Sequence, residues 1–144
     1  MPNKIHIRGA QIVTMDDELD DRASGDILIE DGAIVSVGPS LDSAATAAGS
    51  GAETIDGTGM IALPGIIDAH TCLWQTVLRG YVPDLWPGAY YSELLPLRQK
   101  FSVQDNYNAA WVGGHEMLSY GTTTVVDYCH NISTPGYADA SIEA

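Results

Sequence analysis

The sequence is poor in basic residues, and it has no long hydrophobic run. Six lysine and arginine residues stand against nineteen aspartate and glutamate residues, so the formal net charge of the 144 residues is −13. With so few cations, binding to nucleic acid or to an anionic membrane has no electrostatic basis. No apolar stretch approaches the roughly 20 residues that a membrane-spanning helix needs. The first residues, Met1 to Arg8, also lack the apolar region of a signal peptide, which favours a cytoplasmic location.

Cysteine is also scarce. Cys72 and Cys129 are the only two, and they lie far apart rather than in a C-x-x-C pair, so a disulfide framework is not indicated. Hydrophobic residues nevertheless make up 45% of the chain, which is enough for a core and argues against general disorder.

The first third of the chain is patterned as a small antiparallel sheet. Apolar and polar residues alternate over 5–8, as in a half-buried strand. Two runs rich in β-branched residues, 27–30 and 33–37, flank Asp31-Gly32, a dipeptide that tolerates the positive φ angles of a type I′ turn. The pattern predicts a β-hairpin.

Two other segments of the first third are expected to be loops. The acidic run 16–21 lacks the alternating ligand order and closing glutamate of an EF-hand, so a solvated loop is expected rather than a calcium site. The small-residue tract 43–52 has no apolar periodicity and is typical of a flexible surface loop.

From residue 60 onward the pattern changes to that of a βαβ unit. The nearly continuous apolar run 60–68, with a break at Pro64-Gly65, predicts a strand buried on both faces. Ser102, with an acid three residues later, resembles a helix N-cap, and Gly121 is a stop signal. The β-branched run 122–128 then predicts a second buried strand. Ligand sites of parallel sheets built from such units lie at the carboxyl ends of the strands.

His70 and Cys72 follow the first of these strands and are the first candidates for chemistry. If the strand continues through them, their side chains project to the same face. Imidazole nitrogen and thiolate sulfur both bind zinc, but two ligands leave at least one more to be found. The alternative is a polar strand end that carries a buried thiol.

Several motifs resemble the amidohydrolase superfamily, closest in style to its cytosine deaminase and triazine hydrolase branch. The string IALPGIIDAHTCLWQTVLRG resembles the P-G-x-x-D-x-H-x-H signature that opens the first barrel strand. IEDGAIVSVG and ETIDGTGMIALPG are similar to the N-terminal β-sandwich and its return into the barrel, and GTTTVVDYCHN resembles the second barrel strand. The resemblance implies an α/β fold with a small N-terminal β-sandwich part at 1–59 and the start of a (β/α)8 TIM barrel at 60–144.

The resemblance also implies a function. Members use one or two divalent metals, commonly zinc or iron, to activate water. The expected activity is therefore deaminase-type hydrolysis of a non-peptide C–N bond in a small cyclic or amidine-like substrate. Metal ligands would be His70 and Cys72, although the second histidine of the motif falls on Cys72, so the metal could be absent. Trp74, Gln75 and His130 are candidate substrate contacts, each with packing or a solvated loop as the alternative. No catalytic residue is assigned.

A complete barrel needs about 250 residues, so these 144 residues cannot form one. The exposed strands need a cover, which could be the remainder of the barrel, a second half-chain or another copy of this chain, and an oligomer is expected. The alternative function is that of a non-catalytic fragment or degenerate homologue acting as a binding or assembly module, in which Cys72 marks decay of the metal site.

Overall fold

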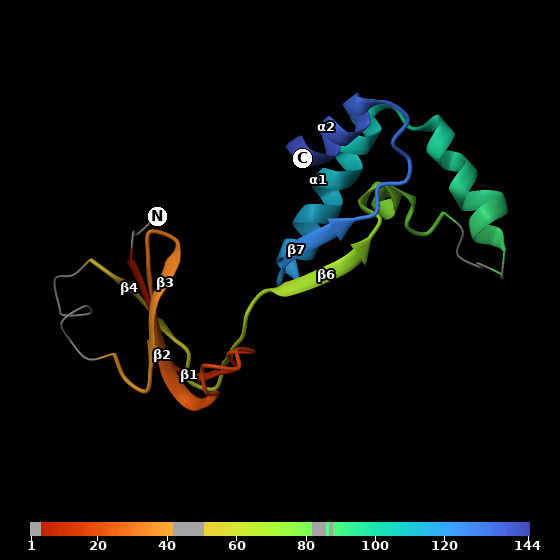
Figure 1. Ribbon diagram of the computed structural model, residues 1–144. Coiled ribbons are helices and arrows are strands. Elements are labelled where there is room, and N and C mark those ends of the chain that lie inside the picture. The colour runs from red at the N-terminus through yellow and green to blue at the C-terminus, as the bar shows by residue number, and fades with distance from the viewer. Residues whose placement is uncertain (1–3, 42–50, 82–85, 87) are drawn as a thin grey trace. The chain divides into compact units, whose positions relative to one another are not determined.

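The computed structural model describes residues 4–41, 51–81, 86 and 88–144. These residues form two compact units that divide between Pro64 and Gly65 (Figure 1). Of the small-residue tract 43–52, only Gly51 and Ala52 are described, so the predicted loop lies mostly outside the described residues.

The first unit is a five-stranded open sheet in the order β3-β2-β1-β4, with β5 also paired to β1. Neighbouring strands are antiparallel from β1 to β3, whereas β4 and β5 run parallel to β1. The strands are β1 (Lys4–Ile12), β2 (Arg22–Glu30), β3 (Ala33–Gly38), β4 (Glu53–Asp56) and β5 (Ile61–Ala62). The predicted small sheet is therefore present, and it recruits two further parallel strands from the segment that precedes Pro64.

The hairpin between β2 and β3 is confirmed. Glu30 pairs with Ala33, so the connection has two residues. Asp31 has a φ of 50° and Gly32 a φ of 82°. Positive φ at both central positions is what a type I′ turn requires, and aspartate and glycine tolerate it better than other residues. The acidic run 16–21 is exposed throughout and lies in a turn and its flanks, as predicted for a solvated loop.

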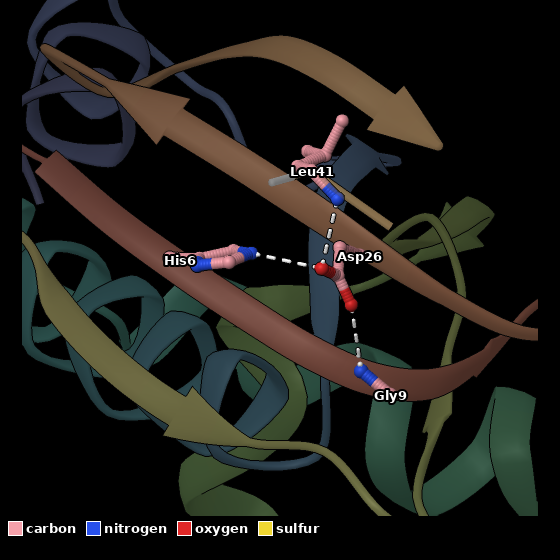
Figure 2. A network of polar contacts seen from close by, with 4 residues as sticks. All are labelled: His6, Gly9, Asp26 and Leu41. Carbon is pink, nitrogen blue, oxygen red and sulfur yellow. Dashed lines mark hydrogen bonds and ion pairs between the residues drawn. The ribbon is translucent and has the colours of Figure 1, made fainter. Parts of the chain in front are cut away.

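A buried polar pair lies between β1 and β2 (Figure 2). His6 and Asp26 are only 3% and 6% exposed, and His6 Nε2 lies 3.1 Å from Asp26 Oδ2. The Asp26 carboxylate also accepts the backbone N–H groups of Gly9 and Leu41, both at 3.0 Å. Burial by itself would raise the pKa of Asp26. The two backbone hydrogen bonds and His6 together lower the pKa by more than burial raises it, so it lies below its ordinary value.

The second unit contains a two-stranded parallel sheet, β6 (Ile66–Thr71) with β7 (Thr122–Asp127). The helix α1 (Val103–Ser119) lies between them in sequence and completes the predicted βαβ unit (Figure 1). Four other helical segments were not predicted. They are the 3-10 helices η1 (Leu73–Leu78) and η3 (Leu95–Lys100), the π-helix η2 (Tyr90–Leu94) and the terminal helix α2 (Pro135–Glu143).

The local capping signals correctly predict where α1 begins and ends. The Ser102 hydroxyl accepts the backbone N–H of Asp105 at 3.2 Å, and the Asp105 carboxylate accepts the backbone N–H of Ser102 at 2.8 Å, which is a complete capping box. After the helix, Gly121 adopts a φ of 86°, the left-handed conformation that favours glycine at a helix end.

Two predictions about the strands are wrong. The apolar run 60–68 is not one strand, because β5 belongs to the first sheet and β6 to the second, with the Pro64-Gly65 break between them. Nor is the second sheet buried on both faces, since Ile67 is 69% and Val126 56% exposed. A two-stranded open sheet lacks neighbours on both edges, so its apolar side chains remain uncovered. Within the described ranges, no helix is long and apolar enough to cross a membrane.

Candidate functional site

The candidate site lies where β6 and β7 end side by side. The backbone N–H of Tyr128 donates to the carbonyl oxygen of Thr71 at 2.7 Å, so the two segments stay paired at the ends of the strands. Here Asp127 Oδ1 accepts the backbone N–H of Leu73 at 3.0 Å, which anchors the start of η1 to the end of β7. Asp127 thus caps the start of η1.

The side chains of His70 and Cys72 do not share one face of a strand. Strand β6 ends at Thr71, and Cys72 is the residue that precedes η1, so the condition for a shared face is not met. The exposed His70 ring stacks on Tyr128 with ring centroids 5.0 Å apart. Asp68 also contacts this segment, where its Oδ1 accepts the backbone N–H of His70 at 3.0 Å and not a proton of the imidazole.

The Cys72 side chain is partly buried and lies in an unfavourable environment for a thiolate. Burial raises the pKa of the Cys72 thiol, and the negative charge of Asp127 and the neighbouring Cys129 raise it further. Because the thiolate is the form that binds a metal, this environment opposes metal binding by Cys72.

The described residues do not complete a metal site. In the parts of the chain with defined placement, no group of three or more histidine, cysteine, aspartate and glutamate side chains converges closely enough to hold an ion. Among the described residues, one buried acceptor has no hydrogen-bond partner, namely Asp127 Oδ2. That oxygen adds a candidate donor beside Cys72, but the set as it stands does not fit a resident zinc ion, which needs at least three protein ligands.

Trp74, Gln75 and His130, the candidate substrate contacts, are brought together by the fold. Trp74 is fully buried, and its Nε1–H donates to His130 Nδ1 at 3.2 Å. Tyr90 joins the group, because its hydroxyl lies 2.8 Å from His130 Nε2 and accepts from Gln75 Nε2 at 3.2 Å. Sequence reasoning missed Tyr90, which carries no local motif.

Two open hollows flank this network. One, of about 390 Å³, is lined by Cys72 and Gln75 together with residues of η1 and Leu94. The other, of about 450 Å³, is lined by His130 and the loop that follows it, together with Arg98, Gln99 and Tyr137. Both have the size of cavities that accept small molecules. Of the network, Gln75 lines the first hollow and His130 the second.

Known proteins are similar to nearly the whole of this chain. The 5-methylthioadenosine/S-adenosylhomocysteine deaminase of Caldicellulosiruptor saccharolyticus is 36% identical over 142 residues, which are 95% of this chain and 31% of that protein. The 5'-deoxyadenosine deaminase of Methanosarcina mazei is 30% identical over 124 residues, which are 85% of this chain and 27% of that protein. No protein-family model matches.

Solved structures agree with these relatives. A variant of atrazine chlorohydrolase TrzN from Arthrobacter aurescens TC1, complexed with zinc and atraton, superposes with a TM-score of 0.79 and 31% sequence identity. The match covers 96% of this chain and 32% of that one. The similarity is thus to deaminases and a chlorohydrolase. The chain belongs to the amidohydrolase superfamily, as an N-terminal portion that spans about a third of the length of its relatives.

Proposed function

We propose that this chain is the N-terminal portion of a metal-dependent hydrolase that releases an amino group from a small heteroaromatic substrate. The observation that carries the proposal is the 36% identity, over 95% of this chain, to a curated deaminase. The position of the D-x-H-x-C segment supports it, because this segment ends β6 at the edge of a parallel sheet where ligands of such folds bind. In this proposal residues 1–59 contribute to a β-sandwich and residues 60–144 begin a TIM barrel.

Trp74, Gln75 and His130 are proposed to form the substrate-binding site. They share one hydrogen-bonded network that lies beside two hollows, which supports a common binding role. Trp74 would act indirectly, because it is fully buried and orients His130 through its indole N–H. Gln75 would supply polar atoms to the substrate itself. His130, whose two ring nitrogens lie against Trp74 and Tyr90, would contact the substrate through its ring carbons.

His70 and Cys72 would contribute to the metal site, with further ligands from outside the described residues. A bound divalent metal would supply an activated water for attack on the ring carbon. A thiolate in place of the second imidazole makes a longer, softer bond and donates more charge to the metal. The environment of Cys72 also raises the pKa of its thiol. Because this thiol must lose its proton to bind, we expect metal to be bound more weakly than by a histidine pair.

The partner of the open sheets is proposed to be the remainder of the barrel, a second half-chain or another copy of this chain. Apolar side chains are exposed in both sheets, with Ile34 in the first and Ile67 in the second 65% and 69% exposed, respectively. Strand edges and apolar faces of this kind favour association with further strands.

A non-catalytic role is the second candidate function, in which the chain serves as a binding or assembly module. The substitution of Cys72 for the second histidine of the motif favours it, as does the failure of the described residues to converge on a metal. The two candidates differ in their metal content and in their chemistry.

Metal content and ammonia release, measured together, test the proposal. The intact protein, Cys72→His, Cys72→Ala and the control Cys129→Ala are analysed for zinc and iron and assayed with 5-methylthioadenosine and 5'-deoxyadenosine. We expect substoichiometric metal in the wild type and in Cys129→Ala, more metal in Cys72→His, and less in Cys72→Ala. Ammonia release should follow metal content. Metal-free, inactive protein in all four cases would support the non-catalytic role.

A further inference from the structure

The residues on both sides of His130 are tied to helix α1 through one buried side chain. Asn106 of α1 is fully buried, and Asn131 is only 4% exposed. Asn106 Oδ1 accepts from Asn131 Nδ2 at 2.7 Å. On the other side of His130, the Cys129 thiol donates to Asn131 Oδ1 at 3.1 Å. The backbone of His130 is therefore held between two residues that share one hydrogen-bonded network.

The same carboxamide of Asn106 also holds helix α2. Its Nδ2 donates to the carbonyl oxygen of Tyr137 at 2.9 Å and to Ser141 Oγ at 2.6 Å. One side chain thus connects three segments, which are α1, α2 and the loop that carries His130. Two of the residues in this network, Asn131 and Tyr137, line the same hollow as His130.

The orientation of both amide groups follows from donor chemistry. A backbone carbonyl oxygen only accepts, so the Asn106 atom that faces Tyr137 must be Nδ2. Asn106 Oδ1 then faces Asn131, which must present its own Nδ2 there and its Oδ1 to the Cys129 thiol. Burial is the first cause that raises the pKa of this thiol, so the thiol keeps the proton that it donates. Each bond fixes the next, and the network specifies one arrangement of the loop.

The imidazole of His130 is held by a separate set of contacts. Trp74 Nε1–H donates to Nδ1 at 3.2 Å, and the Tyr90 hydroxyl lies 2.8 Å from Nε2. Hydrogen bonds weaken steeply when their lengths or angles change, so the ring keeps both contacts only while its backbone stays in place. The anchored backbone and the ring contacts of His130 therefore depend on each other.

We propose that Asn106 is a positioning residue that acts through Asn131 to hold the His130 imidazole against Trp74 and beside the hollow. The inference rests on the proposed function in one respect, namely that His130 contacts the substrate. The position of the ring does not depend on that function. Apolar packing at position 106 could fill the same space, but it is not directional and would leave the loop free to shift.

The position of the ring is tested by NMR of the Trp74 indole, in the intact protein labelled with ¹⁵N at tryptophan and assigned with Trp74→Phe. Asn131→Ala should move the indole N–H resonance upfield, because its hydrogen bond to His130 lengthens. The matched control is Ser141→Ala, which removes a partner of the same Asn106 amide from α2 instead of from the loop. Both variants should lower the melting temperature, but only the first should move the resonance.

If Asn131→Ala does not fold, Asn131→Ser replaces it, since this change removes the amide and leaves a smaller cavity. A resonance that is unchanged in the Asn131 variant, or that moves equally in Ser141→Ala, would overturn the inference.

The consequence for binding is tested with 5'-deoxyadenosine as the probe. Asn131→Ala and Asn106→Ala should each raise KM about tenfold with kcat changed less than about twofold, because His130 is proposed to bind the substrate and not to react with it. The double variant should match Asn106→Ala, since the two residues act through one bond, and Ser141→Ala should leave KM unchanged. Additive effects, or an unchanged KM in an active Asn131→Ala protein, would overturn the inference. If the wild type is inactive, the proposed function fails, whereas the indole resonance still decides the position of His130.

Discussion

Leu73 and Asp127, 54 positions apart in the sequence, are joined by a hydrogen bond of 3.0 Å from the backbone N–H of the first to Oδ1 of the second. Leu73 begins η1 and Asp127 ends β7, so the bond connects the two segments that carry Trp74 and His130. The first turn of a helix has backbone N–H groups without partners in the helix, and Asp127 satisfies one of them from a distant strand. The geometry of the candidate site therefore depends on this carboxylate.

Removing the Asp127 side chain should destabilise the second unit. Asp127→Ala leaves the buried Leu73 N–H without an acceptor, and we expect a loss of about 1–3 kcal/mol in the free energy of unfolding. Asp127→Asn keeps an acceptor and should lose less. The measurement is urea unfolding followed by tryptophan fluorescence, since all three tryptophans lie in this unit. The control is Asp139→Ala at an exposed position of α2, and an equal loss there would contradict the assignment.

The same carboxylate should govern the acidity of Cys72. Burial is the first cause that raises the pKa of this thiol, and the charge of Asp127 is the second. Asp127→Asn removes that charge, so the pKa of Cys72 should fall while staying above its ordinary value. The test is the pH dependence of alkylation in a Cys129→Ser background, where only Cys72 reacts. Asp139→Asn should leave the profile unchanged, and an unchanged profile in Asp127→Asn would show that the charge does not reach the thiol.

The parts of the fold that depend on local chemistry could be predicted from the sequence. The capping box of Ser102 and Asp105 and the Asp31-Gly32 turn are set by neighbouring residues, and both are confirmed. The burial of β6 and β7 depends instead on strands and helices packed beside them. The apolar run that contains Ile67 therefore predicted a buried position, whereas this residue is 69% exposed in the open sheet.

The candidate site was predictable only in part, for a similar reason. Trp74 and His130 were predicted as substrate contacts because each lies three positions past the end of a recognisable strand, and this role stays a prediction. Tyr90 was missed because its partners lie 15 and 40 positions away. The alternation at 5–8 likewise groups His6 with the polar, solvent-facing positions, whereas its contact with Asp26 on the next strand keeps it buried.

The first unit should lose stability in acid through Asp26. Its folded-state pKa is below the ordinary value of 3.8, so the ionised carboxylate stabilises the fold above about pH 4. That contribution is lost as the pH falls from 3.8 through the lower folded-state pKa. Asp26→Asn should remove this acid dependence and lower stability by about 1–3 kcal/mol at pH 7. Hydrogen exchange of the β1 and β2 amides measures the acid dependence and the stability at pH 7. The control is Asp17→Asn at an exposed position. Equal acid dependence in Asp26→Asn and wild type would assign it to other groups.

Association of the 144-residue chain should depend on the open face of its second sheet. Ile67 and Val126 are 69% and 56% exposed on β6 and β7, and apolar strands without neighbours pair with other chains. We expect light scattering to detect species larger than the 15.3 kDa monomer at micromolar concentration. Ile67→Lys should reduce them, because a charged side chain on an exposed strand opposes pairing.

The control is Ile142→Lys on α2, where an apolar residue 83% exposed lies outside the sheet. A stable monomer in the wild type, with cooperative unfolding, would mean that the chain closes its own core in solution. Equal effects of the two substitutions would instead place the association outside β6 and β7.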